Sequence, residues 1–165
     1  MTADWRRDRI GAALRGENPT VLLRMRSGFA VLGDTQFLPG YCLLLGIPRV
    51  PHLSDLEAGD RRTFLFDMSL IGEAIEEVCR PQGLRRVNYE IHGNTDPFVH
   101  AHIWPRYDWE PPEYRQWPVY GYPRAIREDP AHTFSAAAHG ALQEELRAAL
   151  GRLMESAGVQ TETDA

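Results

Sequence analysis

The chain has 165 residues, of which 43% are hydrophobic and 25% charged, a composition typical of one globular domain spanning residues 1–165. The net charge of −5 and the lack of any run of about 18 apolar residues argue against general nucleic-acid binding and against a membrane-spanning helix. All 18 basic residues are arginine, which excludes enzymes that depend on a lysine Schiff base or a P-loop lysine. We therefore expect a cytoplasmic protein that binds neither nucleic acid nor membrane.

The first third of the sequence predicts a short helix and an antiparallel meander. Residues 4–15 are expected to form the helix, which Pro19 ends. Its basic side chains are interpreted as solvated surface: Arg6, Arg7 and Arg9. Three apolar runs are typical of strands, at residues 21–25, 29–32 and 41–45. The predicted hairpin turn between the first two strands is Ser27-Gly28.

A long amphipathic helix is expected next. Ser54 with Glu57 three residues later has the form of a capping box. Apolar side chains then recur at helical spacing, at Phe64, Met68, Ile71, Ile75 and Val78. Pro81 and Gly83 end the pattern, so the helix occupies most of the segment between the cap and Pro81.

The second half predicts a further hairpin, an arm and a closing helix. Residues 85–91 and 98–104 are expected to form two strands joined by a polar loop. The segment 107–130 is rich in Pro, Tyr, Trp and Arg and lacks a clear period, so it is interpreted as a long ordered arm. Leucines at helical spacing predict a helix over about 134–157. Five strands with separate helices predict an α+β domain.

The candidate site lies in the last predicted strand, where His100 and His102 are separated by one residue. Alternate residues of a strand point to the same face, so both imidazoles should project from one surface. The intervening residues are apolar and should face the other way: Val99, Ala101 and Ile103. An apolar back with a two-histidine front is the pattern expected of an active site on a packed scaffold.

This stretch resembles the signature of the histidine triad superfamily, in which three histidines alternate with apolar residues and a Pro-Arg pair often follows. Pro105-Arg106 anchors the comparison and aligns His100 with the middle, nucleophilic histidine and His102 with the third. Phe98 then occupies the position of the first histidine. The preceding Gly93-Asn94-Thr95 resembles the Gly-Gln-Ser/Thr run of the family.

The resemblance covers about residues 20–106. Within the superfamily, the chain is similar to bacterial diadenosine-polyphosphate-hydrolase-like members. Asn88 resembles the family's amide on the phosphate side, and Asp34 lies near the position that contacts ribose. Tyr41 stands where many members have a further histidine. The resemblance implies a five-stranded antiparallel sheet with a long helix packed on it and a C-terminal helix. It also implies a homodimer with the two sheets side by side, to which we expect the aromatic arm to contribute.

The implied activity is that of a nucleotide hydrolase or nucleotidyl transferase acting on dinucleoside polyphosphates or related conjugates. His100, neutral near pH 7, would attack an α-phosphorus and form a nucleotidyl-imidazole that water cleaves. Stabilisation of the phosphate oxygens or the leaving group would come from His102, Asn94 and Thr95. In the family, the carbonyl two residues before the nucleophile orients it, and Phe98 still offers that carbonyl. The protein itself needs no metal or other cofactor, although a divalent cation such as magnesium can accompany the substrate.

Two alternatives fit the same residues. His-x-His is a common metal pair, and a metalloenzyme could draw a third ligand from His92 or Cys42. Neither Cys42 nor Cys79 has a metal-binding spacing, however, and buried free thiols are the simpler interpretation. The other alternative is a non-catalytic nucleotide-binding protein that has lost turnover together with the first triad histidine.

Overall fold

The computed structural model describes residues 4–159. These residues contain a five-stranded sheet with the strand order β1-β2-β3-β5-β4. The strands are β1 (Val21–Met25), β2 (Gly28–Leu32), β3 (Cys42–Gly46), β4 (Leu84–His92) and β5 (His100–Tyr107). All neighbouring strands are antiparallel. The predicted α+β architecture is therefore confirmed, and β4 is left as an edge strand.

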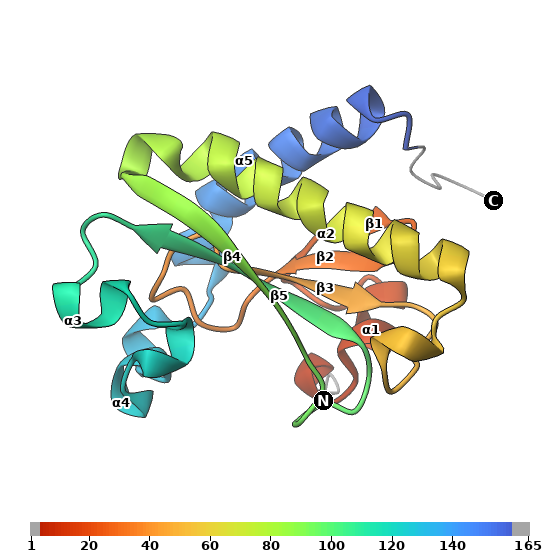
Figure 1. Ribbon diagram of the computed structural model, residues 1–165, viewed down its shortest axis with the longest axis horizontal. Helices are drawn as coiled ribbons and strands as arrows, with labels where there is room; N and C mark the ends of the chain where they lie inside the picture. Colours follow the sequence, from red (N-terminus) through yellow and green to blue (C-terminus); the bar gives the residue numbers. More distant parts are fainter. Residues whose placement is uncertain (1–3, 160–165) are drawn as a thin grey trace.

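Two long helices, α2 (Ala58–Cys79) and α5 (Ala136–Ser156), lie on one side of the sheet (Figure 1). In the part of the chain that the structure describes, the other side carries the short helices α1 (Arg9–Leu14), α3 (Pro112–Arg115) and α4 (Arg124–Arg127). Among the described residues, no helix has the length and apolar character needed to cross a membrane. The unequal covering leaves part of the second sheet face available for a site.

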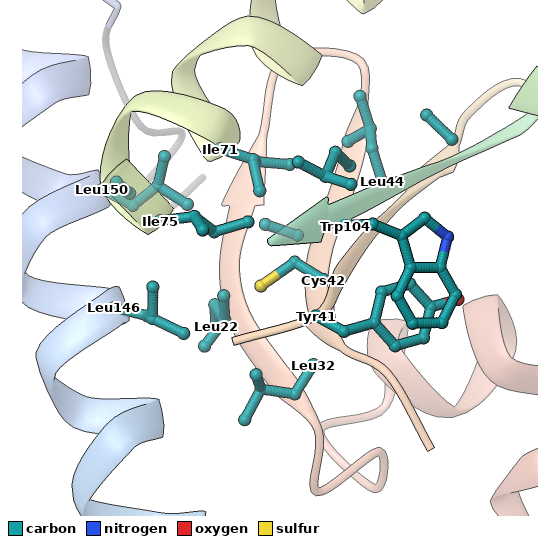
Figure 2. Packing of buried hydrophobic residues seen from close by; sticks show 14 of the residues in the cluster. Leu22, Leu32, Tyr41, Cys42, Leu44, Ile71, Ile75, Trp104, Leu146 and Leu150 are labelled. Carbon is teal, nitrogen blue, oxygen red and sulfur yellow. The ribbon is translucent and has the colours of Figure 1, made fainter. Parts of the chain in front are cut away.

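The hydrophobic core fills the space between the sheet and the two long helices. Strand alternation sends one set of side chains toward α2 and α5, as Figure 2 shows for part of the core. Its buried members include Leu22, Leu32, Leu44, Ile71, Ile75, Leu146 and Leu150. Cys42 and Cys79 are buried free thiols, as predicted, and burial raises the pKa of both. Cys42 is thus part of the core and not a candidate metal ligand.

Two details of the predicted elements were wrong. Ser54 does not cap α2: the N-cap of this helix is Glu57, whose side chain makes no capping hydrogen bond. Ser54 belongs instead to a separate 3-10 turn before α2, Leu53–Asp55. In this turn the Asp55 carboxylate accepts a hydrogen bond from the His52 backbone N–H at 3.1 Å. β5 begins two residues late, at His100, because the Val99 N–H donates to Val50 O (2.8 Å), outside the ladder. Residues 107–130 form an ordered arm that contains α3, α4 and the 3-10 turn Val119–Gly121.

A buried ion pair holds the start of this arm. The carboxylate of Glu110, which has no exposed surface, accepts from Arg106 at 2.8 to 3.1 Å and from the Tyr107 backbone N–H at 2.6 Å. Tyr122 donates its hydroxyl to the same carboxylate at 2.7 Å. Arg106 also donates to the carbonyls of Tyr114 and Trp117. The arginine of the Pro-Arg motif therefore has a structural role, which is to fasten the arm to β5.

Candidate active site

The two histidines of β5 project from the sheet face opposite α2 and α5, as predicted. In the strand register His100 lies beside Leu45 of β3 and His92 of β4, and His102 lies beside Leu43 and Glu90. The imidazole centroids of His100 and His102 are 4.9 Å apart. Two positions of one strand therefore deliver two imidazoles to a single surface.

The backbone fixes the orientation of His100. Its Nδ1 lies 2.8 Å from the carbonyl oxygen of Phe98, and a carbonyl only accepts, so Nδ1 carries the proton. Nε2 then has a free lone pair, which is what a nucleophilic imidazole requires. The contact that the sequence analysis expected between the Phe98 carbonyl and His100 is present, although Phe98 is not a histidine.

His102 is held by Tyr41, which precedes β3. The Tyr41 hydroxyl lies 2.5 Å from Nδ1 of His102, and burial raises the pKa of Tyr41 so that it remains a donor. Nδ1 therefore accepts, and the His102 proton resides on Nε2. Burial, helped by His100 and His92, lowers the pKa of His102 to about 3, so this imidazole is neutral near pH 7. The result is a neutral N–H donor of fixed tautomer beside the nucleophile.

Two cavities meet at the histidines. The first, of about 260 Å³, has mostly apolar walls from the sheet face, including Val31, Leu43, Leu45 and Trp104. The Tyr41 ring stacks on the Trp104 indole with centroids 3.3 Å apart, and Figure 2 shows the two rings overlapping. The second cavity, of about 370 Å³, is more polar and is lined by His92, Asn94 and Thr95. Four residues line both cavities: Asp96, His100, His102 and Tyr120.

The structure brings most of the predicted site residues to these cavities. Asn94 and Thr95 line the second cavity with His100 and His102, and Asp34 lines the first. Asn88 does not join them; it lies in β4 opposite Trp104, beside a separate surface hollow lined by several arginines. Asn88 is on the same face of β4 as Glu90 and His92, but it lies four residues before His92, which is the residue of β4 opposite His100.

Asp34 is not a free carboxylate. Both of its oxygens accept from the Arg9 guanidinium, at 2.8 and 2.6 Å. Arg9, interpreted from the sequence as solvated surface, is instead half-buried and lines the first cavity. This pairing joins α1 to the segment after β2, and it raises the pKa of Arg9 further.

Sequence reasoning gave no catalytic role to two contributors from outside β5, although it named His92 as a candidate metal ligand. His92 enters the site from β4, and Tyr120 enters it from the arm, with their rings 5.5 Å apart and nearly perpendicular. The guanidinium of Arg127 lies 5.2 Å from the centre of the Tyr120 ring. The two-residue spacing of Glu90 and His92 was the available signal for His92, which was predicted to follow the strand 85–91 and is instead the last residue of β4. Tyr120 is one of several aromatic residues in the arm, and its spacing does not distinguish it from the others.

A metal centre finds no support in this arrangement. Within residues 4–159, no group of three or more His, Cys, Asp or Glu side chains is placed so that it could hold a metal ion. His100 donates its Nδ1 proton to a carbonyl, and Cys42 lies in the core. The residues present fit acid–base and nucleophilic chemistry better than metal binding.

No protein-family model and no curated protein matches the sequence. Solved structures do. A histidine triad protein from Marinobacter aquaeolei is 21% identical, with a TM-score of 0.65 over 81% of this chain and 89% of that one. A hypothetical histidine triad nucleotide-binding protein from Sulfolobus tokodaii is 13% identical, with a TM-score of 0.67 over 93% and 98% of the two chains. The chain has the histidine triad fold.

A third structure with the histidine triad fold is a zinc-bound protein from Mycobacterium smegmatis, 18% identical, with a TM-score of 0.55 over 88% of this chain and 94% of that one. At these identities the shared feature is the fold. The likeness confirms the five-stranded sheet with its long helix, which the sequence resemblance implied. The chemistry depends on the side chains that this chain places at the histidines.

Proposed function

We propose that this chain is a nucleotide hydrolase or nucleotidyl transferase that cleaves dinucleoside polyphosphates or related nucleotide conjugates. The observation that carries the proposal is the hydrogen bond from Nδ1 of His100 to the Phe98 carbonyl, which leaves Nε2 as a nucleophile at the junction of two cavities. The Sulfolobus protein of the same fold is called nucleotide-binding, which agrees with this substrate class.

The reaction would run in two steps. The Nε2 lone pair of His100 attacks the α-phosphorus, an N–P bond forms, and the bond from phosphorus to the leaving group breaks. Water then attacks the same phosphorus and loses one proton to a base, a P–O bond forms, and the electron pair of the N–P bond returns to His100. The Nε2–H of His102 would donate to a phosphate oxygen in both steps, where fixed donors stabilise developing charge.

The two cavities suit the two halves of such a substrate. The apolar first cavity, with its Trp104 and Tyr41 rings, would take the nucleoside base, and Asp34 would meet the ribose while it remains paired with Arg9. The polar second cavity would take the leaving group, with donors from Asn94 and Thr95. A divalent cation such as magnesium would arrive with a polyphosphate substrate.

Mass spectrometry of the intact protein tests the proposal. Brief exposure to a panel of dinucleoside polyphosphates and nucleoside phosphoramidates should add one nucleotide to His100, followed by release of the mononucleotide. Tight nucleotide binding with neither adduct nor product would select the non-catalytic alternative, which the replacement of the first triad histidine by Phe98 favours. Loss of turnover on chelation, with one transition metal per chain, would select a metalloenzyme.

We expect Tyr41→Phe to lower kcat by about 10- to 100-fold with little change in KM, because His102 loses the donor that fixes its tautomer. Single-turnover kinetics would measure the effect. Tyr89→Phe is the matched control, because this phenol lies in β4 on the face turned to α2, close to Gly72. Equal rates for Tyr41→Phe and wild type would contradict the role of Tyr41.

We also propose the homodimer. Within the described residues, one edge of β4 has no neighbouring strand, and its side chains Tyr89 and Ile91, on the face turned to α2, are exposed. Leu65 and Phe66 of α2 are exposed as well. Light scattering at micromolar concentration should give twice the chain mass, and Ile91→Lys should give the single mass. Leu14→Lys, at an exposed leucine of α1, should leave the mass unchanged. A monomeric wild-type protein would overturn this proposal.

A further inference from the structure

A third histidine reaches the site from the neighbouring strand. His92 is the last residue of β4 and lies directly opposite His100 in the ladder. Its ring centroid is 5.5 Å from that of His102, at an interplanar angle of 62°. Since His100 and His102 are themselves neighbours, the sheet assembles three imidazoles although the β5 motif holds only two of the three expected histidines.

The surroundings of His92 differ from those of the other two imidazoles. Its Nε2 lies 3.4 Å from Oε2 of Glu90, the preceding residue on the same strand face. The carboxylate is mostly covered, with 16% of its side chain exposed, whereas 37% of the His92 side chain is exposed. A carboxylate accepts a hydrogen bond from an imidazole N–H, so Glu90 can hold His92 in position. His100 and His102, by contrast, have their Nδ1 atoms beside a carbonyl and a phenol.

His92 also lies on one particular side of the nucleophile. It lines the polar cavity with Asn94 and Thr95, and it is not among the residues that line the apolar cavity. In the proposed reaction the apolar cavity takes the nucleoside, so His92 is on the side of the group that departs. The Tyr120 ring stands perpendicular to His92 at 5.5 Å, which restricts the positions open to the imidazole.

We propose that His92, paired with Glu90, is the catalytic acid that protonates the leaving group. This inference rests on the proposed function. In the first step, Nε2 of His100 bonds to phosphorus while protonated His92 gives a proton to the departing oxygen or nitrogen, and the bond from that atom to phosphorus breaks. In the second step, His92 takes a proton from the attacking water, and the N–P bond breaks toward His100. One water is consumed, and His92 ends protonated, as it began.

The rate advantage that a catalytic acid provides increases with the basicity of the leaving group. An alkylamine needs a proton to depart, whereas p-nitrophenolate leaves as a stable anion. General acid catalysis is typically worth about 10²- to 10⁴-fold where a proton must be transferred. A residue that only shaped the cavity would affect both substrates alike.

The test compares His92→Gln with the wild-type chain on two adenosine 5′-monophosphate derivatives, one an amide of an alkylamine and the other a p-nitrophenyl ester. We expect kcat/KM to fall by about 10²-fold on the amide and by less than about threefold on the ester. Glu90→Gln should show the same preference more weakly. His52→Gln, at an exposed histidine outside both cavities, should change neither rate.

Added imidazole provides a second measurement, because it should restore part of the lost rate of His92→Ala on the amide only. Equal losses on the two substrates, or no loss on the amide, would overturn the acid role while leaving the nucleophile intact. A wild-type chain that forms no adduct with either derivative would overturn the proposed function and this inference together. The two failures are therefore distinguishable.

Discussion

Replacing His100 with asparagine is expected to lower turnover by roughly 10⁴-fold or more and to abolish the nucleotide adduct, because no other group supplies the bond to phosphorus. The fold should survive, since the side chain belongs to the site face and not to the core of α2 and α5. Quenched single-turnover reactions, read by mass spectrometry, would measure the rate and the adduct in one experiment. His52→Asn serves as the control for histidine loss at the surface.

Two further variants separate the roles around His100. His102→Ala should slow the reaction by about 10²- to 10³-fold while some adduct still forms, because His102 is proposed to stabilise charge and not to make the bond. Phe98→His should change the rate only modestly, since the Phe98 group that bonds to His100 is a backbone carbonyl. Near-normal hydrolysis by His100→Asn, or an adduct on His102, would mean that the alignment on Pro105-Arg106 is wrong by two residues.

The largest expected effect on stability comes from Glu110→Ala. Its carboxylate is fully buried and accepts from Arg106, Tyr107 and Tyr122, so truncation leaves a buried guanidinium without its partner. Breaking a buried pair on one side typically costs about 3–5 kcal/mol of unfolding free energy. Urea denaturation would measure the loss. We also expect reduced activity, because the arm that carries Tyr120 is fastened through Arg106.

Glu128→Ala is the matched control, because Glu128 pairs with Arg124 at 2.7 Å but both side chains are more than half exposed. Surface pairs of this kind contribute little to stability, because solvent screens them. The double variant Arg106→Met with Glu110→Leu should recover much of the stability that Glu110→Ala loses, since no unpaired charge remains. A loss from Glu110→Ala as small as that from Glu128→Ala would contradict the role given to the buried pair.

The sequence by itself determined the elements and the centre of the site. Strand and helix periods reflect which side chains meet the core, so the five strands, the long helix and the C-terminal helix could be predicted near their observed positions. His100 and His102 share a face because they are two residues apart in a strand, whatever packs around them. The carbonyl bond to His100 is equally local, since Phe98 is only two residues away.

Only the tertiary structure decided which other side chains lie beside His100 and His102 in the site. His92 faces the histidines because β4 pairs with β5 in the register that sets His92 opposite His100, and a slip of one residue would turn it to the other face. Tyr41 reaches His102 across 61 positions, and Arg9 reaches Asp34 across 25. Periodicity tells which way a side chain points along its own element. Periodicity does not tell which distant donor or acceptor forms a hydrogen bond with that side chain, because the partner depends on how the elements pack.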